Sequence, residues 1–324
     1  MPKHFGPLAQ AAFHDDVNAI RQRLAQRPYS KDSLGDALFH AASHGYADIA
    51  DLLLDAGAPI NDATDKGCGK RTALMAAAGA GHFDVVRLLV SRGAAINDVD
   101  DYGQTALMYA AQGHGRIVKF LLANGADANV VGKYRTALMW ASESGCVEIA
   151  RMLLAAGADI HARKSGTNAL LCAAKEGQLA MVRFLVSQGA NVKESTADGE
   201  TALLLAANSE HVETCRFLLQ EGMNVNAADK NGLTPLMLAC NGFAKKTIRL
   251  LLDAGADTNA ISRHGYTPLT FAARCGRVDI VRLLLAHGAR RGLNTAISTA
   301  KDWDNAPVLA VLQAAATENH KTKE

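Results

Sequence analysis

The feature that most constrains the fold of this chain is a segment that recurs along most of its length. The clearest copy, residues 265–289, has the pattern of two short helices joined at Gly276. Thr267 can cap the first helix, and Gly288 can end the second in a left-handed conformation. The second helix has an apolar face at helical spacing, formed by Val278, Val281, Leu284 and Leu285. Helices this short are not stable alone, so each pair must pack against similar neighbours.

The Thr-Pro-Leu triplet that opens this copy returns upstream at a nearly constant step. The same triplet or a close variant begins at Asp36, Thr72, Thr105, Thr136, Asn168, Thr201 and Thr234. Neighbouring triplets from Thr72 onward are 31 to 33 residues apart. The first step is 36 residues, and its excess falls in the Gly-rich stretch 65–70, which predicts a longer loop there.

A second signature lies in the turn before each triplet, for example Gly-Ala-Asp-Ala-Asn at residues 125–129. Together the two signatures resemble the ankyrin repeat, whose unit of about 33 residues is a β-turn and two antiparallel helices. The resemblance implies an all-α solenoid of stacked helix-turn-helix units with β-turn fingers. It implies an array of about eight repeats over residues 36–289.

Both ends depart from the repeat, as the outer faces of a stack must. We expect residues 1–35 to form a degenerate N-terminal capping repeat and residues 290–316 a C-terminal one. The polar tail 317–324 is expected to be disordered. The segments 208–210 and 241–243 replace the usual glycine between helices, so looser corners are expected there.

The resemblance also implies a histidine directly after each triplet, which would link neighbouring repeats by hydrogen bonds. This chain has other residues there: Phe39, Met75, Met108, Met139, Leu171, Leu204, Met237 and Thr270. We therefore predict that a mostly apolar column replaces the polar network.

Composition indicates which partners and which cellular compartment to expect. The net charge of +2 is too small to indicate a nucleic-acid or membrane partner. The six cysteines show no Cys-x-x-Cys spacing, which favours a reducing compartment over a disulfide framework. The N-terminus has no apolar run typical of a secretory signal, and no stretch has the length of a membrane span. A cytoplasmic location is expected; the alternative, delivery into another cell as an effector, has no residue that supports it.

By analogy with the family, binding residues lie just before the Thr and at two, five and six positions after the Leu. In the central repeats this predicts a partner-binding set of Tyr102, Gln104, Tyr109, Gln112, Lys133, Arg135, Trp140, Glu143, Lys164 and Lys175. Tyr109 and Trp140 occupy equivalent positions, and interfaces favour such aromatic anchors beside basic residues. The alternative is that both rings fill the seam between repeats.

No sequence motif indicates a metal-binding, catalytic or nucleotide-binding site. His40 and His44 share a helical face, yet no third metal ligand accompanies them. Cys172 and Glu176 lack a histidine, and residues 67–70 do not open a helix as a nucleotide-binding loop must. The sequence therefore predicts no catalytic residue, metal or cofactor. We also expect the acidic run 97–101 to face Lys133 and Arg135.

Two functions remain open at this point. The first is a non-catalytic protein-protein interaction module or scaffold, monomeric when unbound, which binds a protein partner on its concave face. The second is a small-ligand or oligonucleotide sensor in which Tyr109 and Trp140 stack on a base. Its phosphate contacts would come from Lys133, Arg135 and Lys164. The low net charge argues against the second.

Overall fold

The computed structural model of the chain describes residues 7–63, 69–242 and 244–321. Contacts divide it into two compact units, residues 1–165 (unit 1) and residues 166–324 (unit 2). Apart from turns and isolated bridges such as Ser195–Thr201, the regular structure of the described residues is helical. Each unit is a series of helix pairs, as the sequence predicts.

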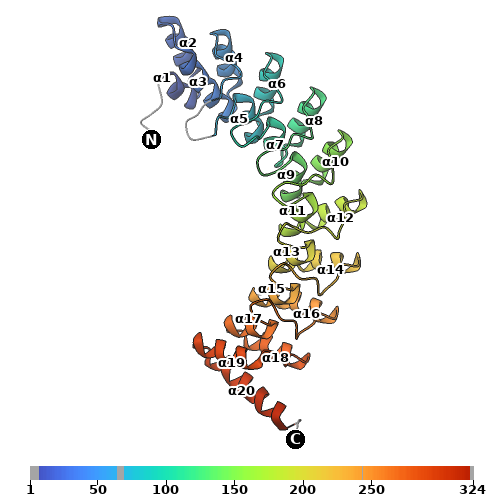
Figure 1. The fold of residues 1–324 in the computed structure, drawn as a ribbon. Coiled ribbons are helices and arrows are strands. Elements are labelled where there is room, and N and C mark those ends of the chain that lie inside the picture. The colour runs from blue at the N-terminus through green and yellow to red at the C-terminus, as the bar shows by residue number, and fades with distance from the viewer. Residues whose placement is uncertain (1–6, 64–68, 243, 322–324) are drawn as a thin grey trace. The chain divides into compact units, whose positions relative to one another are not determined.

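Unit 1 contains the first ten helices (Figure 1): α1 Pro7–Phe13, α2 Val17–Gln26, α3 Lys31–His44, α4 Ala47–Asp55, α5 Ala73–Ala80, α6 Phe83–Ser91, α7 Ala106–Ala110, α8 Gly115–Ala123, α9 Ala137–Glu143 and α10 Val147–Ala155. The odd-numbered helices, here called first helices, pack on one another from α1 to α9. The even-numbered second helices form a parallel row behind them.

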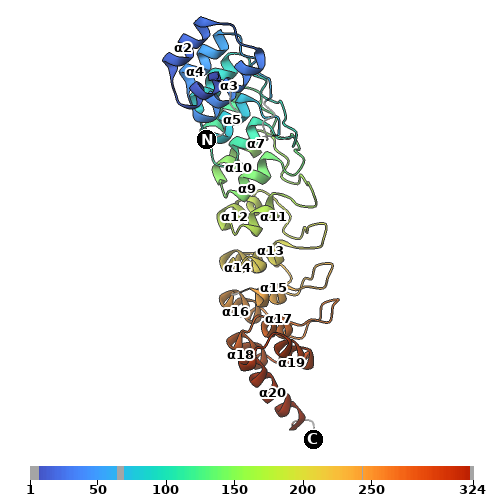
Figure 2. The ribbon, with the colours of Figure 1, turned by 90° about the vertical axis from the view of Figure 1, so that its left-hand side faces the viewer.

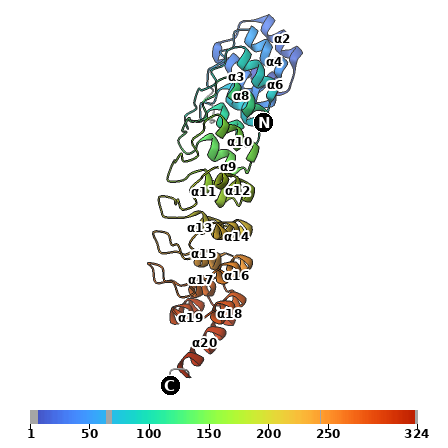
Figure 3. The same cartoon turned by 90° about the vertical axis from the view of Figure 1, so that its right-hand side faces the viewer.

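Unit 2 repeats this order with α11 Ala169–Lys175, α12 Leu179–Ser187, α13 Ala202–Asn208, α14 Val212–Gln220, α15 Pro235–Asn241, α16 Lys245–Asp253, α17 Pro268–Arg274, α18 Val278–Ala286, α19 Leu293–Asp302 and α20 Ala306–Lys321. Within each unit the connecting fingers project from one side of the helix rows (Figures 2 and 3). Helix α20 packs on α18 and α19 and closes the row.

The recurring triplet starts each first helix by the same local chemistry. The Thr105 hydroxyl accepts a hydrogen bond from the Met108 amide at 3.3 Å, and Thr136 and Thr234 cap α9 and α15 in the same way. The cap satisfies an amide that would otherwise lack a partner at the helix start. The following leucine is then fully buried, with Leu107 1% exposed.

The predicted apolar column after the triplet is confirmed. Met75, Met108 and Met139 in unit 1 and Leu171, Leu204 and Met237 in unit 2 are at most 1% exposed. Thr270 is the polar member of the series, and it satisfies its hydroxyl in a capping box with Thr267. The repeats therefore contact one another through close-packed apolar side chains at this level.

Polar links between repeats come from other positions that sequence reasoning missed. The His82 ring is 3.1 Å from the Ser43 carbonyl, the His114 ring is 3.0 Å from that of Gly79, and the His211 ring is 3.0 Å from that of Lys175. In each case Nε2 is the atom that meets the carbonyl oxygen. These histidines precede second helices, one helix later than the family position.

A second set of links uses asparagines at the base of the fingers. Asn129 accepts a hydrogen bond from the Asp159 amide at 2.9 Å and donates one to the Gly157 carbonyl at 2.8 Å. Asn97 in unit 1 and Asn259 in unit 2 bond the backbone of the following repeat in the same manner. These residues fix the finger of one repeat against the next.

Several boundaries differ from the sequence prediction. Helix α3 begins at Lys31, capped by Ser30, so the expected boundary at residue 36 falls inside a helix. Helix α20 continues to Lys321, so the described residues 317–321 are helical and not disordered. Its Ala-rich segment 314–316 contains no Gly or Pro that would stop it.

The expected irregular corners are partly described. Glu210 takes the corner position with a φ of 66°, a left-handed conformation that glycine adopts at lower cost. Residue 243 lies outside the described residues, as does most of the longer loop expected at 65–70. In the part of the chain that is described, no helix combines the length and hydropathy needed to cross a membrane.

Candidate functional site

A groove of about 550 Å³ crosses the first helices of unit 1 from α1 to α7. Its lining comprises Phe13, Phe39, His40, Ser43, His44, Arg71, Ala76, Gly79, Ala80, Tyr109 and Gln112. Helix α5 contributes the small residues Ala76, Gly79 and Ala80, whereas its neighbours contribute large ones. The small size of these side chains on α5 therefore leaves the hollow between α3 and α7.

Aromatic and imidazole rings form the wall next to α1. The Phe13 ring lies edge-on to the His44 ring, with centroids 4.8 Å apart, and His44 stacks on Tyr46 at 5.8 Å. Phe13 is 40% exposed although it is large and apolar. Exposed aromatic surface beside a groove is typical of a contact site.

Arg71 supplies a positive charge to this groove. Its guanidinium carbon lies 5.8 Å from the centroid of the Phe39 ring and 5.6 Å from that of Tyr109. The attraction between a cation and aromatic faces holds the side chain across the groove. Two histidines and one arginine line the groove, and no Asp or Glu is among its lining residues.

Tyr109 is fixed by a buried carboxylate. Its hydroxyl donates to Asp100 Oδ2 at 2.7 Å, and Asp100 is 5% exposed. The other oxygen, Oδ1, accepts from the backbone amides of Tyr102 and Gln104 at 2.8 Å each. Burial and the hydrogen bond to Asp100 raise the pKa of Tyr109 above its usual range. The hydroxyl of Tyr109 is thus held by Asp100, and the residue also lines the groove.

A second cluster surrounds Trp140 on α9. Arg135 forms an ion pair with Glu143, and its guanidinium carbon lies 4.9 Å from the centroid of the Trp140 ring. Trp140 is half-buried, and its buried Nε1 has no hydrogen-bond partner among the residues that the structure describes. The ring is therefore neither fully packed nor freely exposed, and both sequence interpretations of Trp140 stay predictions.

A third cluster lies at the tips of two fingers. The Tyr102 and Tyr134 rings are 6.4 Å apart, and Lys133 Nζ is 5.6 Å from the centroid of the Tyr134 ring. Val99 and Val131 beside them are 53% and 51% exposed. The Lys133 amide donates to the Tyr102 carbonyl at 2.7 Å, which joins the two fingers.

The structure thus distributes the predicted set over separate places. Tyr102 and Lys133 lie at the finger tips; Tyr109 and Gln112 line the groove, and Gln104 donates to Tyr109 at 3.5 Å. Arg135, Trp140 and Glu143 form the cluster on α9. Lys164 is half-buried near the end of unit 1, and Lys175 belongs to unit 2.

The acidic run before Tyr102 makes contacts that differ from those expected. Asp100 is used by its own turn and by Tyr109, and Asp101 lies 3.8 Å from Lys70 in an ion pair. Arg135 is paired with Glu143 from its own repeat. The expected facing of this run toward Lys133 and Arg135 stays a prediction, and the contacts seen are those of Asp100, Asp101 and Arg135 with these closer partners.

The groove itself extends beyond the predicted residues, and the sequence contained the signal for it. The positions two, five and six after Leu38 are His40, Ser43 and His44. The same offsets from Leu74 give Ala76, Gly79 and Ala80, and Arg71 directly precedes Thr72. Applied to the first two repeats, the family rule would have predicted most of the lining.

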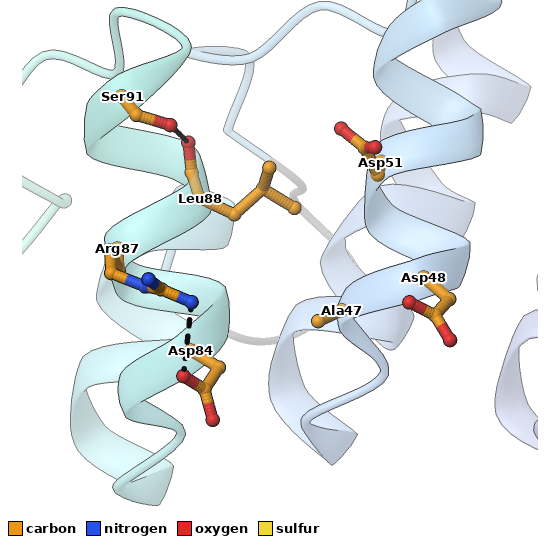
Figure 4. A pocket seen from close by; sticks show the side chains of 7 residues that line it. All are labelled: Ala47, Asp48, Asp51, Asp84, Arg87, Leu88 and Ser91. Carbon is orange, nitrogen blue, oxygen red and sulfur yellow. Dashed lines mark hydrogen bonds and ion pairs between the residues drawn. The ribbon is translucent and has the colours of Figure 1, made fainter.

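A different hollow lies between the second helices α4 and α6 (Figure 4), lined by Ala47, Asp48, Asp51, Asp84, Arg87, Leu88 and Ser91. Arg87 turns along its own helix toward Asp84, 3.5 Å away, while Leu88 points from α6 toward α4. Arg92 pairs with Asp51 and, at 3.0 Å, with Asp55. Arg87 in the lining and the neighbouring Arg92 are thus both paired with carboxylates of the second helices.

Metal and thiol chemistry receive no support from the geometry. The His40 and His44 rings are 6.5 Å apart, and His44 Nδ1 lies 2.9 Å from the His40 carbonyl. Among the described residues, no group of three or more His, Cys, Asp or Glu could hold a metal ion. The described cysteines Cys146, Cys172, Cys215, Cys240 and Cys275 are free thiols.

Comparison with known proteins agrees with this architecture. The family model described as "Ankyrin repeats (3 copies)" matches overlapping segments: residues 38–132, 99–164, 115–196, 138–229, 170–262 and 226–295. The chain belongs to the ankyrin repeat family. The crystal structure of the human ASB11 ankyrin repeat domain is similar, with a TM-score of 0.63, 26% sequence identity, and coverage of 68% of this chain and 99% of that domain. A comparison with curated proteins finds no match.

Proposed function

We propose that this chain is a non-catalytic binding module that holds a protein partner against the first helices and fingers of unit 1. Ankyrin repeats are in general modules for protein interaction. The observation that carries this proposal is the groove, whose open floor on α5 is flanked by the aromatic residues Phe13 and Tyr109. The aromatic finger tips and the Trp140 cluster extend the same contact surface.

Charge indicates the chemistry of the partner segment. The groove contains Arg71, His40 and His44 and has no carboxylate among its lining residues. A segment that carries Asp or Glu beside an apolar anchor complements it: the anchor lies on the α5 floor and the carboxylate meets Arg71. A helix or an extended peptide can both present such residues.

Filling the groove tests this proposal. Ala80 is exposed and is the last residue of α5, so Ala80→Glu adds both bulk and negative charge with little effect on folding. The partner recovered by the wild-type chain should bind this variant at least about tenfold more weakly in a titration by calorimetry. The matched control is Ala123→Glu, an exposed alanine at the end of second helix α8.

The control variant should bind as the wild type does. Equal affinity of the wild-type chain, Ala80→Glu and Ala123→Glu would contradict the proposal, because a partner in the groove must contact residue 80. Circular dichroism of all three chains confirms that each remains helical.

The alternative of an oligonucleotide sensor has less support. Arg135, which that function requires for phosphate, already forms an ion pair with Glu143. Trp140 has Arg135 on its face, where a base would have to stack. Addition of an oligonucleotide panel should leave the tryptophan fluorescence unchanged. Saturable quenching would instead support the oligonucleotide sensor.

Location and assembly state belong to the same proposal. We propose a cytoplasmic protein that is monomeric until it binds. Light scattering of the purified chain should give the 34.2 kDa of one copy. Fractionation of the source cells with an antibody against the chain would test the location.

A further inference from the structure

Unit 2 contains a second candidate site that the proposed function of unit 1 does not use. A pocket of about 130 Å³ lies where α17 packs against α19, lined by Tyr266, Thr270, Phe271, Arg274, Thr299, Asp302 and Trp303. Pockets for drug-sized ligands measure roughly 300–1,000 Å³. This one has room for a single ring or one side chain.

The aromatic residues of the pocket are unevenly covered. Phe271 is 8% exposed, because the Tyr266 ring lies against it at 5.9 Å and the Arg274 guanidinium carbon lies 5.0 Å from its centroid. Tyr266 and Trp303 are 40% and 61% exposed. These two rings are the aromatic surfaces that a ligand can contact.

Arg274 is held in place by an aromatic ring and a neutral amide. It stacks on Phe271, and its Nη2 donates to the side-chain oxygen of Asn241 on α15. It makes no ion pair within the part of unit 2 that the structure describes. A guanidinium has five N–H donors, so a fixed and half-buried one retains donors suited to a carboxylate.

Asp302 is the other charged residue of the pocket lining, and its carboxylate favours a cationic ligand. It is exposed at the end of α19, where water and salt screen its field, whereas Arg274 is half-buried. Interactions with a half-buried charge are stronger than those with an exposed one. The balance therefore favours an anionic group at Arg274.

We propose that this pocket binds a carboxylate attached to an aromatic or branched apolar group. The carboxylate accepts hydrogen bonds from Arg274, and the apolar group lies against Tyr266 and Trp303. A small aryl acid and the C-terminal residue of a peptide share this chemistry. The site is independent of the groove in unit 1, so either can exist without the other.

Fluorescence of Trp303 tests the proposal. The chain has two tryptophans, so Trp140→Phe leaves Trp303 as the only reporter. Titration with phenylacetate should change its emission saturably, and the neutral isostere phenylacetamide should bind about tenfold more weakly or worse. A peptide that ends in phenylalanine, with a free or an amidated C-terminus, distinguishes a peptide source from a small acid.

Substitutions locate the effect. Arg274→Gln should weaken phenylacetate about tenfold or more, and Arg274→Lys less so, because lysine keeps the charge and loses the paired donors. Arg282→Gln is the matched control, since Arg282 is exposed on α18 away from the pocket lining. Circular dichroism verifies the fold of each variant.

Two results would overturn the proposal. One is the absence of any saturable change up to about 10 mM phenylacetate. The other is tighter binding of phenethylamine than of phenylacetate together with loss of that binding in Asp302→Asn, which would make this a cation site. Neither result bears on the groove of unit 1.

Discussion

The side chain of Tyr109 contributes both to the internal structure of its repeat and to the surface of the groove. Its hydroxyl is committed to the buried Asp100, while its ring lines the groove and contacts Arg71. Because Asp100 also holds the backbone of its finger, the carboxylate connects the finger to the first helix α7. An aromatic residue fixed in this way loses little entropy on binding, which suits it to an interface.

Removal of this hydroxyl should destabilise the chain. Tyr109→Phe leaves Asp100 Oδ2 without its donor, so we expect a loss of about 1–2 kcal/mol in urea unfolding. The control is Tyr134→Phe, whose ring is 51% exposed and which should change stability by less than about 0.5 kcal/mol. Equal effects of the two substitutions would contradict the role given to Asp100.

The same pair predicts a pH dependence. The raised pKa of Tyr109 means that the folded chain favours the neutral phenol. Its stabilising effect is therefore complete below the unfolded pKa of about 10 and is lost as the pH rises from there toward the folded value. The stability difference between the wild type and Tyr109→Phe should shrink above about pH 10, and a constant difference would argue against it.

Cysteine reactivity provides a separate test at single positions. Burial raises the pKa of Cys215 to about 12, and burial with a smaller effect of Cys275 raises that of Cys240. The thiolate is the reactive form, so both should resist alkylation in the folded chain. Half-buried Cys146 and Cys275 should be labelled first, as mass spectrometry after a short iodoacetamide treatment would show. Labelling of Cys215 as fast as Cys146 would be inconsistent with its burial.

The corner between the two helices of a repeat is the element that most restricts sequence. Gly177 has a φ of 68°, and a Cβ there would be 2.2 Å from Nδ1 of His211 in the next repeat. The same contact of glycine with histidine recurs at Gly45 with His82. Glu210 is tolerated at its corner because Ala244, not histidine, holds the equivalent next position. The histidine links therefore require glycine corners.

A double-mutant cycle can measure this requirement. Gly177→Ala should cost about 2–3 kcal/mol, from left-handed strain and displacement of His211 from the Lys175 carbonyl. Gly222→Ala, with a φ of 80° and nothing within 4 Å of its Cβ, should cost only the strain of about 1 kcal/mol. In a His211→Ala background the cost of Gly177→Ala should fall by more than about 1 kcal/mol. An unchanged cost would show that the histidine is not involved.

The asparagine links can be tested in the same way. Asn129→Ala removes two hydrogen bonds to the following repeat, so unfolding free energy should fall by about 1–2 kcal/mol. Asn208→Ala is the control, because Asn208 is exposed at the end of α13. Its effect should stay within about 0.5 kcal/mol. Similar losses in both would indicate that the link contributes nothing specific.

Sequence alone predicted the helix pairs, their caps and the apolar column, because all of these depend on local pattern. It did not predict the early start of α3, since Ser30 has no counterpart in the repeat pattern. It missed the histidine links because the family places its histidine on the first helix of a repeat, whereas these histidines directly precede the second helix. The groove was also missed, because the family's binding positions were considered only in the later repeats, whereas the small residues that form its floor lie on α5 in an earlier one.

Over the whole molecule, we propose one binding surface in each unit. Unit 1 offers a long groove with exposed aromatic residues and positive charge, suited to a protein segment. Unit 2 offers a pocket for one small acidic group. Both lie on first helices, while the second helices in both units provide the packing that supports them.

Hydrogen–deuterium exchange of the chain with and without its protein partner tests whether the partner lies in the groove of unit 1. We expect slower exchange in the first helices α3, α5 and α7 and in the finger at residues 99–104, because a partner in the groove covers them. Exchange in the second helices α4, α6 and α8 should stay unchanged. Protection of these second helices, with α3 and α5 unaffected, would show that the partner binds the opposite face and not the groove.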